Sequence, residues 1–253
     1  EYHINRLVHH FKKPYIALTN GVTMGGGVGL SLHGSHCVAS PDLRWAMPET
    51  SIGFFPDVGS TYYLSRLKNY IGFYLALTGN IISAEDAFHL RLSPYIVVKE
   101  KFDVLEKKLV ETPFLETDHD VVTNIITSLS EKIVVNKIKW QREEINRCFC
   151  FKTIEEIFSA LEKEGTNFSE ETVAQLKKRS PTSLKVTLKQ MWLAQHKTLD
   201  EVIEMDYKIA CTMLAHHDFF EGIRAAVIDK DKNPQWKPAH HDAVSDAGVD
   251  AYF

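Results

Sequence analysis

The sequence lacks the features that would assign it to several specialised classes of protein. Its four cysteines (Cys37, Cys148, Cys150 and Cys211) form neither a CxxC pair nor a paired framework, which favours a reducing intracellular compartment over a disulfide scaffold. No apolar run approaches the length of a membrane span. The 29 Lys and Arg residues do not outnumber the 33 Asp and Glu residues, which argues against a dedicated nucleic-acid binder. The sequence therefore predicts neither nucleic acid nor membrane among its partners.

The start of the chain lacks both an initiator methionine and a signal peptide. The opening residues 1–5 contain no charged region followed by an apolar stretch. We therefore expect the sequence to begin partway along a longer protein, with any targeting segment upstream of Glu1. The predicted compartment is the mitochondrial matrix if the protein is eukaryotic and the cytoplasm if it is bacterial.

What is present is the composition of an ordinary globular protein. Its 253 residues, 44% hydrophobic and 25% charged, can bury a full core. Short β-prone runs occur before residue 61, at Tyr15–Thr19, 37–39 and 45–47, and helical patterns dominate afterwards. Capping residues three positions before an acid mark the starts of later helices, at Ser83/Asp86, Thr153/Glu156 and Thr198/Glu201. This order predicts an α/β core with a helical C-terminal layer.

A glycine cluster, Gly25-Gly26-Gly27 with Gly29, follows the first predicted strand. It lacks the Lys-Ser/Thr pair of a P-loop, and its spacing does not match the dinucleotide-binding fingerprint. Two interpretations remain open. The cluster is either a close packing contact between helix and sheet, or a strand-to-helix turn whose unpaired N–H groups bind a ligand oxygen. A turn of the second kind stabilises the oxyanion that forms when a thioester carbonyl is attacked.

Several further motifs follow one another along the chain. They are the segments 13–21, the triple glycine 25–27, 46–50, 55–59, 76–79, 180–185, 218–222, 228–231 and Pro234. Together they resemble the crotonase (enoyl-CoA hydratase/isomerase) superfamily and, within it, the 3-hydroxyisobutyryl-CoA hydrolases. The resemblance covers nearly the whole chain.

The resemblance implies a crotonase-like core, a ββα spiral, which would be N-terminally incomplete in this chain. It predicts a core region at residues 1–100 that carries the active site, and a helical extension and C-terminal layer at residues 101–253. One of the superfamily's two oxyanion donors comes from a loop that would lie upstream of Glu1.

The resemblance also implies roles for five residues. Gly26 would donate its backbone N–H to the thioester oxygen, and Gly25 would bind the substrate beside it. Glu49 would act as the nucleophile or as the base for an attacking water. Asp57 would bind the 3-hydroxyl of the acyl group, and Glu1 would contact the substrate. Taken singly, Glu49 and Asp57 are also typical of a helix start and a turn.

Two positions favour hydrolysis over hydration. Gly29 occupies the position where the superfamily's hydratases carry a second catalytic Glu, and Asp57 occupies a position where they tend to have glycine. We therefore expect hydrolysis of a short branched 3-hydroxyacyl-CoA, 3-hydroxyisobutyryl-CoA, to the free acid and CoA, a step of valine catabolism. The alternatives are an enoyl-CoA hydratase/isomerase and a non-catalytic acyl-CoA-binding or structural homologue.

The expected partner is the acyl-CoA substrate, and a homo-oligomer remains open. No separate cofactor is expected, because CoA is part of the substrate. No metal is expected either, because the paired histidines 9–10, 216–217 and 240–241 have no regular ligand spacing to acids.

Overall fold

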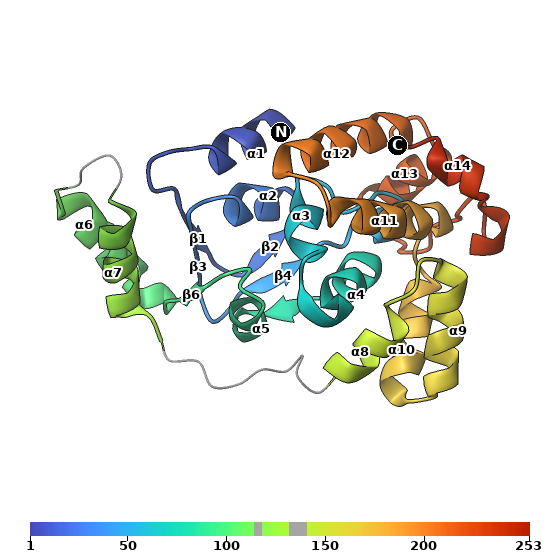
Figure 1. The fold of residues 1–253 in the computed structure, drawn as a ribbon, viewed down its shortest axis with the longest axis horizontal. Helices are drawn as coiled ribbons and strands as arrows, with labels where there is room; N and C mark the ends of the chain where they lie inside the picture. The colour runs from blue at the N-terminus through green and yellow to red at the C-terminus, as the bar shows by residue number, and fades with distance from the viewer. Residues whose placement is uncertain (114–117, 132–140) are drawn as a thin grey trace. The chain divides into compact units, whose positions relative to one another are not determined.

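The computed structural model describes residues 1–113, 118–131 and 141–253 (Figure 1). These residues form two compact units. The first comprises Glu1–Ala46 and the described residues of 81–131, and the second comprises Met47–Asn80 and 141–253. Because the units interleave along the chain, neither coincides with the ranges 1–100 and 101–253, and those ranges stay a prediction.

The first unit contains two three-stranded sheets. One has the order β1-β3-β6 and is parallel, with Ile16 paired to His36 and Thr19 to Ala39. The other has the order β2-β4-β5, in which β2 and β4 are parallel and β4 and β5 antiparallel. The strands are β1 (Ile16–Thr19), β2 (Val22–Met24), β3 (His36–Ala39), β4 (Arg44–Ala46), β5 (Ile82–Ser83) and β6 (Tyr95–Ile96).

Successive pairs of strands contribute one member to each sheet, and helix α2 follows the first pair. This alternation is the ββα repeat that the resemblance implied, and the α/β prediction is confirmed. The three β-prone runs overlap β1, β3 and β4, each differing by one residue at an end or at both, whereas β2, β5 and β6 were not predicted. The helices of this unit are α1 (Tyr2–His9), α2 (Gly26–Leu32), α5 (Ala84–His89), η3 (Lys99–Lys101), α6 (Phe102–Glu111) and α7 (His119–Leu129).

A hydrophobic core joins the parallel sheet to the helices α6 and α7. Val38 of β3 packs with Val97, Leu105, Val122 and Ile126, all of them buried. Every residue of β3 is buried, as expected for a parallel strand covered on both faces.

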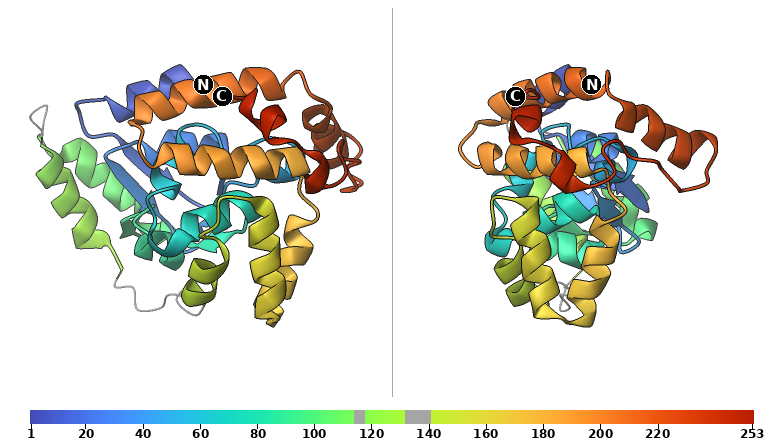
Figure 2. Two further views of the ribbon diagram at one scale, coloured as in Figure 1. Left: turned by 45° about the vertical axis from the view of Figure 1, so that its right-hand side comes forward. Right: turned by 90° about the vertical axis from the view of Figure 1, so that its right-hand side faces the viewer.

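The second unit consists of helices and the loops between them, with no strand among its described residues. Its eight-residue helix α4 is buried at every position, and α9 and α10 lie side by side as an antiparallel pair (Figure 2). The elements are η1 (Glu49–Ile52), α3 (Ser60–Leu64), η2 (Lys68–Tyr70), α4 (Ile71–Thr78), α8 (Arg142–Cys148), α9 (Ile154–Glu164), α10 (Asn167–Leu176), α11 (Pro181–Ala194), α12 (Leu199–Met213), α13 (His217–Ile223), the π-helical turn η5 (Arg224–Ile228), η6 (His241–Ala243) and α14 (Asp246–Asp250).

The predicted helix starts are confirmed. Thr153 with Glu156 and Thr198 with Glu201 each form a reciprocal capping box, and the Ser83 hydroxyl accepts a hydrogen bond from the Asp86 N–H. The helical C-terminal region is confirmed as well. None of the helices in the described ranges is long and apolar enough to cross a lipid bilayer.

Candidate active site

The glycine turn of the first unit connects β2 to α2. Gly25 caps the helix with a φ of 51°, in the left-handed region that favours glycine. Its carbonyl accepts hydrogen bonds from the N–H groups of Val28 (2.8 Å) and Gly29 (3.2 Å). The N–H groups of Gly26 and Gly27 precede the first bonded turn, where helical N–H groups have no partner within the helix. The cluster therefore connects a strand to a helix, and ligand binding by its N–H groups stays a prediction.

The structure brings Glu1 to this turn. A Cβ built on Gly26 would come within 2.5 Å of Glu1 Oε1, so the carboxylate lies directly over the bare backbone of Gly26. Two predicted substrate contacts of the first unit, Glu1 and Gly26, are thus neighbours. Gly29, at the position of the second hydratase carboxylate, is buried within α2 and presents no side chain.

Glu49 and Asp57 both belong to the second unit. Glu49 is the first residue of the 3₁₀ helix η1 and follows Pro48, so the alternative of a helix-start residue is also true of it. Its side chain is buried, with 7% exposure. Its Oε2 atom is buried and has no hydrogen-bond partner among the described residues. Buried polar atoms without partners are rare in folded proteins, and a catalytic role is one of the explanations for such an atom.

Backbone contacts too close for any side chain hold η1 in place. A Cβ on Gly222 of α13 would lie 2.2 Å from the carbonyl carbon of Ile52, and one on Gly53 would lie 2.1 Å from the carbonyl oxygen of Asp218. A Cβ on Gly79 would lie 2.8 Å from the Cα of Pro48. The helix that carries Glu49 is therefore locked against α13 and the end of α4.

Hydrogen bonds also hold η1 in place. The N–H of Ser180 donates to the carbonyl of Thr50 (3.2 Å), and the Thr50 hydroxyl donates to the carbonyl of Leu77 (3.1 Å). Ser180 also donates its hydroxyl to the buried carboxylate of Asp218 (2.6 Å). The segments 76–79, 180–185 and 218–222, which carried part of the sequence resemblance, thus meet around the backbone of η1.

The electrostatic environment of Glu49 disfavours its ionised form. Burial raises the pKa of Glu49 well above its usual value, and the negative charge of Asp57 raises that pKa further, while a bond to its own backbone N–H lowers it. A buried carboxyl with a raised pKa and a nearby second carboxylate is typical of acid–base and nucleophilic sites.

Two residues that sequence reasoning missed support the turn that carries Asp57. Asp206 of α12 accepts a hydrogen bond from the N–H of Gly59 (2.8 Å). Gln190 of α11 donates to Asp206 Oδ1 (2.7 Å) and to the carbonyl of Pro56 (3.1 Å). A sequence signal for Asp206 exists, because it lies on the apolar stripe of α12 with Leu199, Val202, Ile203, Ile209, Ala210 and Met213, all buried.

A basic cavity of about 660 Å³ opens beside η1. Ser51, two residues after Glu49, forms part of its wall, and no acid occurs among the described residues that line it. The indole N–H of Trp236 donates to the carbonyl of Lys178 (3.1 Å) and so fixes the ring in the wall. The cations that line the cavity are Lys177, Lys178, Arg179 and Lys232.

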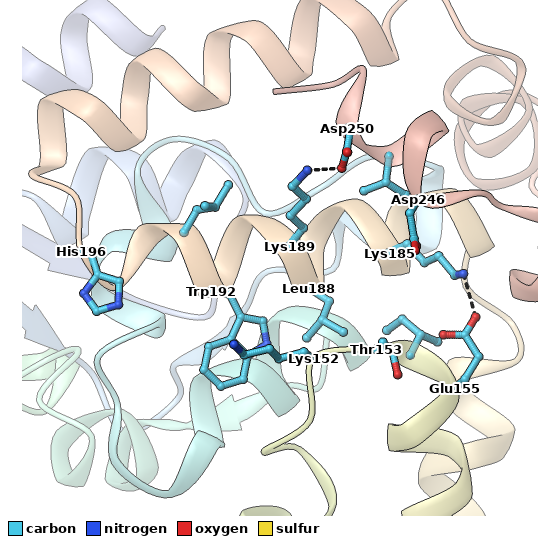
Figure 3. A pocket seen from close by; sticks show the side chains of 13 residues that line it. Lys152, Thr153, Glu155, Lys185, Leu188, Lys189, Trp192, His196, Asp246 and Asp250 are labelled. Carbon is cyan, nitrogen blue, oxygen red and sulfur yellow. Dashed lines mark hydrogen bonds and ion pairs between the residues drawn. The ribbon is translucent and has the colours of Figure 1, made fainter.

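A second cavity, of about 490 Å³, lies along α11 (Figure 3). Two of its lysines are paired with acids, Lys185 with Glu155 (2.7 Å) and Lys189 with Asp250. Near this cavity Glu155, His241 and Asp242 bring possible metal-ligand atoms within 4.8 Å of one another. Because Lys185 already neutralises Glu155, this trio is a weak metal site compared with three unpaired ligands.

Known proteins match this chain over its whole length. Residues 1–253 match the enoyl-CoA hydratase/isomerase family model. The human mitochondrial 3-hydroxyisobutyryl-CoA hydrolase is 42% identical over 258 residues, which cover 100% of this chain and 66% of that protein. The zebrafish (Danio rerio) mitochondrial 3-hydroxyisobutyryl-CoA hydrolase is 40% identical, with 100% and 67% covered. The chain thus spans just under two thirds of the length of the human relative.

Solved structures share the fold. A carnitinyl-CoA dehydratase from Mycobacterium thermoresistibile is 33% identical, with a TM-score of 0.90 and coverage of 100% of this chain and 71% of that one. An enoyl-CoA hydratase from Rhodobacter sphaeroides is 30% identical, with a TM-score of 0.88 and coverage of 99% and 71%. The strand-to-helix glycine turn, the two sheets fed by successive strand pairs and the match over all 253 residues have one explanation: the chain belongs to the enoyl-CoA hydratase/isomerase family.

Proposed function

We propose that the full-length protein hydrolyses 3-hydroxyisobutyryl-CoA to the free acid and CoA. The observation that carries this proposal is the state of Glu49, a buried carboxyl with an unpartnered Oε2 and a raised pKa on a locked backbone. The hydrolases named above, at 40–42% identity, support the same activity.

The reaction needs a group that acts on the thioester carbonyl carbon. Glu49 supplies it in one of two ways. Its carboxylate attacks the carbonyl, CoA leaves as the thiolate, and water hydrolyses the resulting mixed anhydride. Alternatively, the carboxylate takes a proton from a water that attacks directly. In both routes a negative charge develops on the thioester oxygen, and the backbone N–H of Gly26 is the proposed donor to it.

The acyl group determines the roles of the remaining residues. Asp57 is the proposed partner of the 3-hydroxyl, and Glu1, which lies over Gly26, is a proposed substrate contact. A site that holds a carboxylate for a hydroxyl rejects the unhydroxylated analogue, since the carboxylate would lose its partner. Gly25 serves the turn, because its positive φ lets the following N–H groups face a ligand.

The basic cavity beside η1 fits the phosphorylated part of CoA. Phosphates pair strongly with Lys and Arg, and a volume of about 660 Å³ lies within the usual range for small-molecule sites. Because Ser51 lines the cavity on the same short helix as Glu49, a bound CoA would place its thioester end toward that helix.

Steady-state thiol release by the full-length protein tests the proposal. We expect turnover of 3-hydroxyisobutyryl-CoA, abolished in Glu49→Gln and unchanged in Glu204→Gln, an exposed carboxyl on α12. Undiminished turnover by Glu49→Gln would remove Glu49 from the mechanism.

The alternative functions predict other products. Loss of crotonyl-CoA absorbance without thiol release would indicate a hydratase, the activity named for one of the structural neighbours. The buried Gly29 opposes it, because it offers no second carboxylate. Tight acyl-CoA binding without any product would indicate a non-catalytic homologue.

The mitochondrial names of the relatives support a mitochondrial location for a eukaryotic protein of this sequence. Imaging of the tagged full-length protein tests this location.

A further inference from the structure

The turn that carries Asp57 has an unusual backbone. Val58 has a φ of 53° and Gly59 a φ of 73°, and the N–H of Ser60 donates to the carbonyl of Asp57 (3.0 Å). A β-branched residue in the left-handed region is an outlier. Such a conformation persists only where the surrounding structure determines it. Val58 is also buried, with 1% exposure, so neighbours surround the turn.

Asp206 and Gln190 hold this turn on both sides of Asp57. Gln190 reaches the carbonyl of Pro56, the residue before Asp57, and Asp206 reaches the N–H of Gly59, two residues after it. The two side chains are joined to each other by the 2.7 Å bond from Gln190 Nε2 to Asp206 Oδ1. Both are fully buried, at 0% exposure. Asp57 is thereby positioned from two helices, α11 and α12.

Packing alone does not account for Asp206. Its carboxylate has no ion-pair partner in the part of the chain that the structure describes, and burial raises its pKa well above the usual value. A buried carboxyl of this kind is costly, and an apolar residue on the same stripe of α12 would pack as well. Its two oxygens instead accept two hydrogen bonds, one from the N–H of Gly59 in the turn and one from the side chain of Gln190 on α11.

We propose that Asp206 and Gln190 are positioning residues that aim the Asp57 carboxylate and thereby set the preference for a 3-hydroxylated acyl group. This inference rests on the proposed function, in which Asp57 binds that hydroxyl. It adds two residues, from α11 and α12, that touch no reacting atom and act through the turn at Pro56–Gly59.

The first test compares two substrates on the full-length protein. In Asp206→Asn we expect kcat/KM for 3-hydroxyisobutyryl-CoA to fall about tenfold or more, because a buried hydrogen bond to the turn is lost, while kcat/KM for isobutyryl-CoA changes little. The ratio of the two therefore falls. Glu204→Gln, the same change on an exposed face of the same helix, keeps the wild-type ratio. An equal fall for both substrates would overturn the proposal, because it indicates general damage.

The second test does not depend on turnover. Hydrogen exchange at the Gly59 amide, measured by NMR in the full-length protein, reports the bond to Asp206 directly. We expect exchange there to accelerate about tenfold or more in Asp206→Asn, since local opening sets amide protection. Amides within α12 keep their rates, as does Gly59 in Glu204→Gln. Unchanged exchange at Gly59 overturns the proposal, as does faster exchange with an unchanged substrate ratio.

The two tests separate this inference from the proposed function. If the wild-type protein releases no thiol from any 3-hydroxyacyl-CoA, the proposed function and the selectivity built on it fail together, and exchange at Gly59 alone decides whether Asp206 holds the turn. If Asp206→Asn does not fold, Gln190→Met, which removes the bond to Pro56, takes its place in both measurements with the same expected directions.

Discussion

The carboxylate of Asp57 lies near enough to Glu49 for its negative charge to raise the pKa of Glu49, in addition to the larger effect of burial. The two acids are eight positions apart, on separate turns of the second unit. A charge held beside a buried carboxyl keeps a fraction of that carboxyl protonated at a pH where a surface Glu is fully ionised. If the substrate pairs with Asp57 as proposed, its binding would therefore also alter the pKa of Glu49.

The first prediction concerns the pH dependence of Glu49. Asp57→Asn removes a negative charge, which stabilises ionised Glu49 and lowers its pKa. The acidic limb of the kcat/KM profile therefore moves to lower pH, even though kcat/KM itself falls for the hydroxylated substrate. A profile from thiol release measures the shift. Asp103→Asn, an exposed carboxyl of α6, serves as the control and keeps the wild-type limb. A limb that moves to higher pH would contradict this electrostatic account.

The second prediction concerns stability. A carboxyl with a raised folded-state pKa contributes stability that is present below its unfolded pKa and is lost as pH rises through the folded pKa. Because the pKa of Glu49 is raised, Glu49→Gln raises the free energy of unfolding at neutral pH. The increase in the free energy of unfolding is smaller near pH 4.5, the usual pKa of Glu. Urea unfolding at both pH values measures the difference. If Glu49→Gln is less stable than wild type at neutral pH, burial of the Glu49 carboxyl does not destabilise the folded protein as expected.

The third prediction concerns the contact between α13 and η1. Gly222→Ala forces a methyl group against the backbone of Ile52, and such overpacking costs about 1–3 kcal/mol or more. Because η1 carries Glu49, we expect kcat to fall as well. Gly165→Ala is the matched control. Gly165 has a φ of 61° with nothing within 4 Å of a built Cβ. We therefore expect the Gly165→Ala protein to lose about 1–2 kcal/mol of stability, because alanine is strained in the left-handed region, and to keep its kcat.

Unfolding midpoints and kcat values from the two variants separate strain from misplacement of Glu49. An unchanged kcat in a folded Gly222→Ala protein would show that the position of η1 tolerates this displacement.

The fourth prediction concerns the basic cavity. Lys232→Ala should raise KM for the CoA thioester about tenfold at low salt, because a charge-assisted bond to phosphate is lost. The effect shrinks as salt screens the remaining charges. KM for the N-acetylcysteamine thioester of the same acid, which has no phosphate, stays unchanged. Lys163→Ala, at an exposed position of α9, leaves both KM values unchanged. An equal rise for both thioesters would assign Lys232 a role other than phosphate binding.

Local features of the fold could be read from the sequence. The pairs Thr153/Glu156 and Thr198/Glu201 predicted helix starts that the structure confirms, because a capping box needs only four consecutive residues. The runs at β1, β3 and β4 were evident from their β-prone residues between turns. The strands β5 and β6, of two residues each, were not, because two residues show no period of alternation and the pairing partner alone makes them strands.

The candidate site divides in the same way. The sequence by itself determined the glycine turn, and resemblance over the whole chain identified Glu49 and Asp57 as the acids of interest. Only the tertiary structure explains the presence of Gly79, Ser180 and Gly222 in the matching segments. Each of these residues contacts the backbone around η1. The burial that raises the pKa of Glu49, and the hold of Asp206 and Gln190 on a turn more than 130 positions away, are products of packing. Both the burial and these contacts come from side chains that are far apart in the sequence and meet only in the folded protein. A local sequence pattern therefore cannot predict them.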